Sequence, residues 1–199
     1  MNKVFTDILI FLKGKEFSSA DGKIHLNDTS LVRYFDEYAR YLIELSEKKG
    51  SVMLREVKKA GFSSSLLSFL KLLRPVKSSF EILTEQERIE ILLAILSAEG
   101  WGIFELNAYG KKTKAHIKVR QSFEAKYISE KKEANSHCSF ITGFIEAVWF
   151  LAHCTETETL FEEKIDLIEK HISETPVAFE KTCSKEGAQF CSFEINKIR

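Results

Sequence analysis

The sequence predicts an α+β domain in which an antiparallel sheet of about four to five strands packs against helices, with a helical arm at the N-terminus. Three observations predict this class. Apolar residues recur at helical spacing before Gly100, whereas shorter alternating segments follow it. Turn signals join these segments in pairs, as in antiparallel hairpins. Helices and hairpins are interspersed, and this mixed order argues against a doubly wound parallel sheet.

The composition limits the classes of partner. The chain has 199 residues, a length that fits one domain or one domain with an elaborated arm. Its 29 basic and 29 acidic residues give a formal net charge of zero, so no bulk charge attracts nucleic acid or an anionic membrane. We therefore expect no nucleic-acid partner. The 16 phenylalanines indicate either an unusually aromatic core or an apolar molecule bound inside it.

Hydropathy and cysteine content predict the compartment. No segment approaches the roughly 18–20 apolar residues of a membrane-spanning helix, so no membrane span is expected. The apolar run Val4–Leu12 is interrupted by Asp7 and is typical of a short amphipathic helix, not of a signal peptide. Four cysteines without a secretory signal argue for a reducing compartment. We expect a cytoplasmic protein.

Residues 1–50 are expected to form a helix and hairpin extension to a domain at residues 51–199. Asp21 and Gly22 form a tight-turn signal, which predicts a small hairpin. Asp28 or Thr29 can cap the next helix. The apolar stripe of that helix would comprise Leu31, Phe35, Tyr38, Leu42 and Leu45.

Helical patterns continue to Gly100. Two short helices are expected at residues 51–59 and 64–73, separated by Ala60-Gly61. Thr84 and Glu87 have the spacing of a capping box at the start of a further helix, which Gly100 would end.

The remaining elements are two hairpins and two helices. Alternation predicts strands at residues 101–109 and 114–120, and a second hairpin around Gly187 from residues 177–182 and 189–198. Residues 139–152 are apolar on nearly all sides, which predicts a buried helix. An acidic amphipathic helix is expected at residues 156–173.

The second hairpin contains the most specific group of reactive residues. If its turn is symmetric about Gly187, Cys183 lies opposite Cys191, and Phe179 lies opposite Ile195. Two thiolates in this arrangement can share a zinc ion, which takes four soft or borderline ligands in a tetrahedron.

Two other residues are candidates to complete this zinc site. Glu180 can supply an oxygen only if the strand bulges or ends there, because strict alternation puts Glu180 and Cys183 on opposite faces. Cys138 precedes the apolar helix and can close the set if that helix docks on the hairpin, whereas Cys154 at the far end is a weaker candidate. Two alternatives stay open. Buried cysteines often act as small hydrophobic residues, and the hairpin pair can also form a redox dithiol.

Five stretches in a fixed order carry a further signal: Leu54–Ser65 with Gly61, Gly100–Glu105, Val119–Ala125, Cys138 five residues before Gly143, and the hairpin Glu180–Phe193. Together they resemble the V4R (4-vinyl reductase) domain, a relative of the Bet3-type trafficking subunits. The resemblance covers about residues 51–196. Two departures are Ala147, where the family has a second glycine, and the additional helix at residues 156–173.

The resemblance implies an α+β domain, commonly a homodimer, that binds small hydrophobic molecules between its helices and sheet. In phenol-sensing regulators that contain this domain, a zinc ion is held by a cysteine at the helix and by a Glu-x2-Cys-x7-Cys pattern at the hairpin. This ligand set corresponds to Cys138, Glu180, Cys183 and Cys191. Zinc is therefore the expected cofactor.

Three classes of function are compatible with these features. The first is a sensor or carrier that holds a small hydrophobic ligand in an internal pocket. Glu146 supports it, because a carboxylate on an apolar helix must reach solvent, find a partner or face a polar cavity. The expected lining residues, which can equally be ordinary core, are Trp101, Phe104, Phe140, Phe144 and Val148.

The other two classes are an enzyme and a scaffold. The family name suggests a reductase, or an accessory protein, in tetrapyrrole vinyl reduction, but the sequence has no GxGxxG nucleotide-binding motif and no evident catalytic residues. A dimeric interaction module without a ligand would use its phenylalanines to fill an interface.

Overall fold

The computed structural model describes most of residues 51–196 and three short strands near the N-terminus. The described residues are 17–20, 23–26, 29–31, 51–110, 114–122, 124–125, 138–154, 177–184 and 188–196. The helix predicted at residues 156–173 lies outside them. In the main part of the chain the elements are α3 (Ser51–Leu73), η1 (Arg74–Val76), α4 (Lys77–Glu81), α5 (Glu85–Ala98), β4 (Ile103–Gly110), β5 (Lys114–Arg120), α7 (Ser139–His153), β6 (Val177–Thr182) and β7 (Cys191–Asn196).

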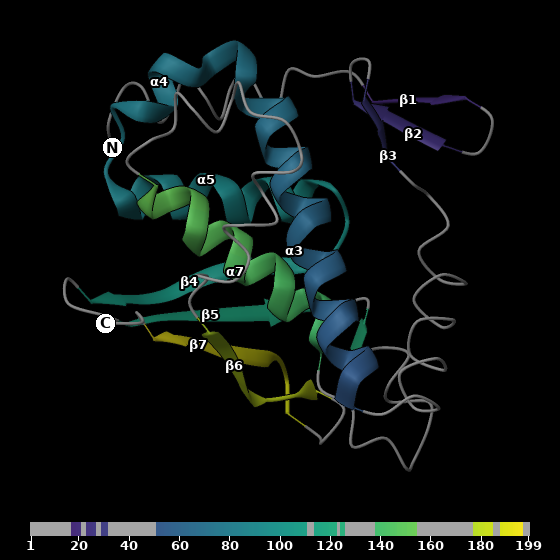
Figure 1. The fold of residues 1–199 in the computed structure, drawn as a ribbon, viewed down its shortest axis with the longest axis vertical. Helices are drawn as coiled ribbons and strands as arrows, with labels where there is room; N and C mark the ends of the chain where they lie inside the picture. Colours follow the sequence, from purple (N-terminus) through teal and green to yellow (C-terminus); the bar gives the residue numbers. More distant parts are fainter. Residues whose placement is uncertain are drawn as a thin grey trace.

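A four-stranded antiparallel sheet forms one layer of the fold. Its strand order is β4-β5-β7-β6, so the first predicted hairpin pairs with the second through β5 and β7. Helix α7 packs against β6 and β7 on one side and along α3 on the other, while α5 packs on β4 and α7 (Figure 1). The predicted α+β class is confirmed.

Helix α5 begins and ends as the sequence predicts. The Thr84 hydroxyl accepts a hydrogen bond from the Glu87 backbone N–H at 3.3 Å, and the Glu87 carboxylate accepts one from the Thr84 N–H at 2.9 Å. This reciprocal capping box satisfies N–H groups that have no partner inside the helix. After the helix, Gly100 has φ +87°, a left-handed conformation that glycine adopts without strain.

The predicted break at Ala60-Gly61 is wrong, because α3 is one continuous helix of 23 residues. Gly61 lies where α3 crosses α7. A Cβ atom at Gly61 would lie 2.3 Å from the Phe140 carbonyl oxygen, and one at Gly143 would lie 2.1 Å from the Lys58 carbonyl oxygen. These glycines permit the two helix backbones to touch. Gly61 is therefore needed for packing, although in the sequence a glycine at this place looks like a helix-breaking signal.

The second hairpin has an irregular register. Ala178 lies opposite Ile195 and Phe179 opposite Glu194, so the predicted pairing of Phe179 with Ile195 is wrong by one residue. The register shifts between Glu180 and Thr182, and beyond this bulge the pairing follows the predicted symmetry about Gly187.

The N-terminal strands form a separate small sheet. Strands β1 (Phe17–Ala20), β2 (Lys23–Leu26) and β3 (Thr29–Leu31) pair antiparallel in that order, at the upper right of Figure 1. The hairpin predicted at the Asp21-Gly22 turn is confirmed. Thr29 belongs to a strand, so the predicted helix cap at this residue is wrong. Leu31 belongs to β3, so its predicted place in the helical stripe is wrong, and the rest of that stripe lies outside the described residues.

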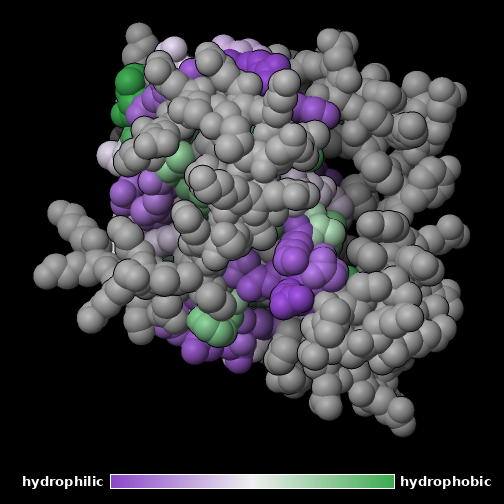
Figure 2. Space-filling model, in the orientation of Figure 1, coloured by the Kyte–Doolittle hydropathy of each residue, from purple (hydrophilic) through white to green (hydrophobic). Residues whose placement is uncertain are grey.

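The core is rich in phenylalanine. In the part of the chain that the structure describes, five phenylalanines are fully buried, namely Phe62, Phe69, Phe80, Phe144 and Phe193. Helix α7 is buried on nearly all sides, as predicted. On the face shown in Figure 2, hydrophilic side chains cover much of the described surface. Among the described residues, no helix combines the length and the apolar character needed to cross a membrane.

The helix crossing gives a stability prediction. Replacing glycine by alanine inside a helix normally stabilises it by roughly 0.8–1 kcal/mol. We expect Gly61→Ala instead to lower the free energy of unfolding by about 1–3 kcal/mol, because the new methyl group overlaps the Phe140 carbonyl. Urea unfolding followed by circular dichroism measures this change. Ser64→Ala, at an exposed position on the same helix, is the control and should stay within about 0.5 kcal/mol of wild type. A Gly61→Ala protein more stable than wild type would contradict the direct backbone contact between α3 and α7 at this residue.

Candidate metal centre and aromatic core

Four predicted ligands come together at the start of α7. The Sγ atoms of Cys138, Cys183 and Cys191 and a carboxylate oxygen of Glu180 all lie within 4.8 Å of one another. The three Sγ–Sγ distances are 3.6, 3.7 and 3.9 Å. A tetrahedral site with Zn–S bonds of about 2.3 Å places its sulfur atoms about 3.8 Å apart. The sulfur spacing therefore fits a zinc ion without rearrangement.

Three elements position these side chains. Cys138 is the N-cap residue of α7, Cys183 follows β6 directly, and Cys191 is the first residue of β7. The bulge between Glu180 and Thr182 removes the strict alternation that would separate Glu180 from Cys183. The strand bulge that Glu180 needs in order to join the site is therefore present.

Backbone N–H groups at the start of α7 bind two carboxylates. Glu180 Oε2 accepts a hydrogen bond from the Cys138 N–H at 2.8 Å. The two oxygens of Glu124 accept from the Phe140 N–H at 3.1 Å and the Ile141 N–H at 3.0 Å. These are donors that a helix cannot satisfy internally, and the helix dipole favours negative charge there.

Glu124 is a residue that sequence reasoning missed. It lies within the Val119–Ala125 stretch that carries the family resemblance, but that resemblance assigns it no role. Local capping patterns cannot find it, because it precedes α7 by about fifteen positions and the contact is tertiary. Burial raises the pKa of Glu124 to about 8, against the opposing effect of the Ile141 and Phe140 N–H groups.

The thiols of the centre differ in acidity. The pKa of Cys191 is lowered by the hydrogen-bond contacts of its sulfur with the Cys138 and Cys183 thiols, and the Ser184 backbone N–H donates to it at 3.4 Å. The pKa of Cys138 is raised by its hydrogen bonds to Cys183 and Cys191 and by burial. The Cys191 thiol therefore ionises more readily than an ordinary cysteine, and the thiolate is the form in which cysteine binds a metal.

Cys154 does not belong to this centre. It follows the last residue of α7, and a helix of 15 residues separates it from Cys138 by about 22 Å. All four cysteines are reduced, and the closest pair of sulfur atoms lies well beyond the roughly 2.05 Å of a disulfide bond.

The residues expected to line a pocket lie in the apolar core. The rings of Trp101, Phe140 and Phe144 contact one another, with centroid distances of 5.6, 4.7 and 4.8 Å. Phe104 and Val148 are buried. The Trp101 indole N–H donates to Glu99 at 3.0 Å, which fixes the orientation of this ring. The structure brings the three aromatic rings together, and their role in ligand binding stays a prediction.

The buried Glu146 carboxylate is paired within the protein, so it does not require a polar cavity. Its Oε1 lies 2.7 Å from Lys58 Nζ on α3 and accepts from the Ala178 N–H of β6 at 2.8 Å. Burial raises the pKa of Glu146, and the hydrogen bond from Lys58 acts in the opposite direction. This carboxylate joins α3, α7 and β6, so it no longer supports a ligand pocket.

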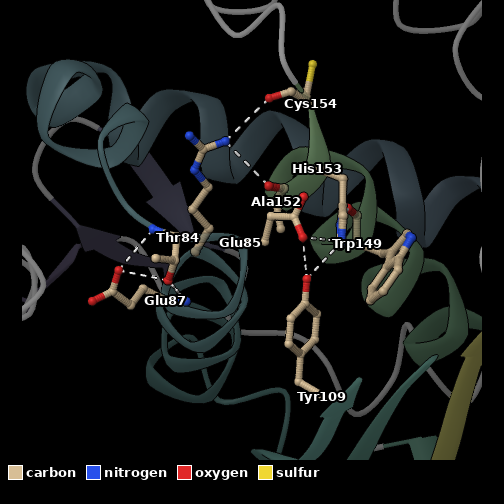
Figure 3. Close-up of polar contacts among 9 residues, drawn as sticks. Thr84, Glu85, Glu87, Tyr109, Trp149, Ala152, His153 and Cys154 are labelled. Carbon is tan, nitrogen blue, oxygen red and sulfur yellow. Dashed lines mark hydrogen bonds and ion pairs between the residues drawn. The ribbon is translucent and has the colours of Figure 1, made fainter. Parts of the chain in front are cut away.

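A second polar cluster lies at the other end of α7 (Figure 3). His153 Nδ1 lies 2.9 Å from the Trp149 carbonyl oxygen, and its Nε2 lies 3.4 Å from the Tyr109 hydroxyl and 3.5 Å from Glu85. The Tyr109 hydroxyl also donates to Glu85. These contacts connect the end of α7 with the start of α5 and the end of β4, which is an interface role.

Comparisons with known proteins give matches among solved structures only. No family model and no curated protein matches the chain. The phenol-responsive sensory domain of the transcription activator PoxR, with phenol, superposes with a TM-score of 0.68 at 14% identity, over 99% of this chain and 92% of that chain. A trafficking protein particle complex subunit 3 from Naegleria fowleri, covalently bound to palmitic acid, gives 0.54 at 9% identity, over 83% and 93%.

The chain has a V4R/Bet3-like fold. This confirms the fold that the sequence motifs predict. A vinyl-4-reductase family protein from Methanocaldococcus jannaschii also matches, with a TM-score of 0.44 at 16% identity, over 100% of this chain and 98% of that chain. Identities of 9% and 14% show a shared V4R/Bet3-like fold alone.

The Lys58–Glu146 pair gives a second stability prediction. We expect Lys58→Met to lower the free energy of unfolding by about 1–3 kcal/mol, because it leaves a buried carboxylate without its cation. The effect stays below that of a fully buried pair, since 28% of the Lys58 side chain is exposed. Lys59→Met is the matched control, because Lys59 forms only an exposed pair with Glu56 and should change stability by less than about 0.5 kcal/mol. Equal effects of the two variants in chemical denaturation would refute the special role of Lys58.

Proposed function

We propose that this protein is a binding module, a sensor or carrier, that holds a small hydrophobic ligand in the apolar core beside α7 and contains a structural zinc ion. The observation that carries the proposal is the convergence of three cysteine sulfurs and one carboxylate where the N-cap residue of this helix meets β6 and β7. Two aromatic residues of the candidate pocket, Phe140 and Phe144, lie on the following turns of the same helix.

The zinc part of the proposal rests on the donor set. Cys138, Cys183 and Cys191 supply soft sulfur donors, and Glu180 supplies an oxygen, which together make a four-coordinate set of the kind that zinc accepts. With four protein ligands the site has no open position, so zinc here would stabilise the fold and not activate a water molecule. It would hold β6, β7 and the start of α7 together.

The ligand part of the proposal rests on the fold and on the aromatic cluster. Two proteins with this fold hold small or extended apolar molecules, phenol in one and palmitic acid in the other. In this chain, Trp101 enters from the segment before β4 and contacts Phe140 and Phe144 of α7. An apolar ligand would lie among these rings, with Phe104 and Val148 completing the lining. We further propose that residues 51–199 act as the binding domain and form a homodimer.

The proposed zinc site predicts the metal content of the purified protein. Protein purified without added zinc should contain about one zinc ion per chain by atomic emission, because four preorganised ligands bind zinc tightly. Cys191→Ser should lose most of this metal, whereas Cys154→Ser should retain it, since Cys154 lies at the far end of α7. A wild-type content far below one, with all four cysteines reacting freely with a thiol reagent, would refute the metal centre.

The ligand prediction compares two buried phenylalanines. Phenol or palmitate should raise the melting temperature of wild-type protein, because a ligand that binds only the folded state stabilises it. Phe144→Leu should reduce this rise by half or more, since it removes ring contacts at the candidate pocket. Phe80→Leu is the control, because Phe80 is equally buried but belongs to α4. If neither probe stabilises the protein and organic extraction recovers no apolar molecule, the scaffold alternative is favoured.

A further inference from the structure

Glu124 caps α7 from outside the helix. It is 4% exposed, and each of its oxygens accepts one backbone N–H from the first turn of α7. The helix has no acidic residue in its own first turn, and its N-cap residue Cys138 makes no side-chain capping bond. The cap that α7 needs is thus supplied by a distant segment.

The backbone after β5 delivers Glu124 to this place. Val119, near the end of β5, pairs with Cys191 of the metal centre. Gln121 then turns the chain with φ +54°, a left-handed conformation that a side-chain-bearing residue rarely adopts. The buried Ser122 hydroxyl accepts the Ala125 N–H at 3.3 Å, which holds the turn that contains Glu124. The strand that pairs with Cys191 therefore leads into the carboxylate that caps the helix beginning after Cys138.

Glu124 is not itself among the candidate ligands. The four ligand atoms that lie within 4.8 Å of one another come from the three cysteines and Glu180. Both Glu124 oxygens instead face backbone N–H groups, two and three residues after Cys138. A carboxylate in this arrangement orients a ligand without binding the metal.

We propose that Glu124 is the positioning residue of the metal centre: by holding the Phe140 and Ile141 N–H groups, it sets the first turn of α7 so that the Cys138 sulfur meets those of Cys183 and Cys191. The proposal rests on the metal site proposed above. The Cys138 N–H is held by Glu180, itself a candidate ligand, so Glu124 is the capping carboxylate that stays available when Glu180 binds the metal.

The test uses the whole 199-residue chain and Co²⁺ as a spectroscopic probe for the zinc site. Glu124→Gln keeps the shape of the side chain but can accept only one of the two N–H groups. We expect Co²⁺ and Zn²⁺ to bind at least about tenfold more weakly, as for residues that orient metal ligands. The cysteine-to-cobalt charge-transfer band should weaken, and the rise in melting temperature on adding Zn²⁺ should be smaller than for wild type.

A cap on another helix separates positioning from stability. Thr84→Ala removes the cap of α5 and should lower the melting temperature without changing metal affinity or the cobalt spectrum. If Glu124→Gln likewise lowers stability but binds metal with wild-type affinity, Glu124 is only a cap and the inference is overturned. If wild-type protein binds neither metal, the proposed metal centre itself fails, and this inference fails with it. Should Glu124→Gln not fold, Glu124→Asp replaces it, and wild-type affinity in that variant overturns the inference.

Discussion

The direct contact between the backbones of α3 and α7 at Gly61 and Gly143 fixes the helix on which the candidate site depends. Because no side chain separates the two helices there, α7 has little freedom to slide or rotate against α3. Its other side packs on β6 and β7, the strands of the cysteine hairpin. Cys138, Phe140, Phe144 and Glu146 all take their places from this one buried helix.

The polar groups around α7 are tolerated because each has a defined electrostatic partner. The carboxylates of Glu124 and Glu180 accept helix N–H groups, Glu146 pairs with Lys58, and the three thiols interact with one another. A buried carboxylate without such partners would be costly, and burial raises the pKa of all three. A divalent cation among Cys138, Cys183, Cys191 and Glu180 would neutralise much of the charge gathered there.

Much of the fold could be predicted from local patterns. The capping box at Thr84, the alternation in β5 and the all-round apolar character of α7 each follow from periodicity or spacing. Gly61 was misassigned because a glycine at a helix crossing looks like a helix end when its partner is unknown. The hairpin spacing and the family resemblance predict the four candidate ligands, and the structure brings these residues together. The bulge that admits Glu180 and the tertiary cap at Glu124 depend on neighbours distant in sequence, which no local pattern contains.

We propose that one zinc ion is bound by three sulfur atoms and one oxygen at the start of α7. X-ray absorption at the zinc edge, on protein purified without added metal, tests it most directly because it reports the ligand types and distances together. We expect three sulfur neighbours at about 2.3 Å and one oxygen at about 2.0–2.2 Å. A first shell made of nitrogen and oxygen, or the absence of bound zinc, would contradict it.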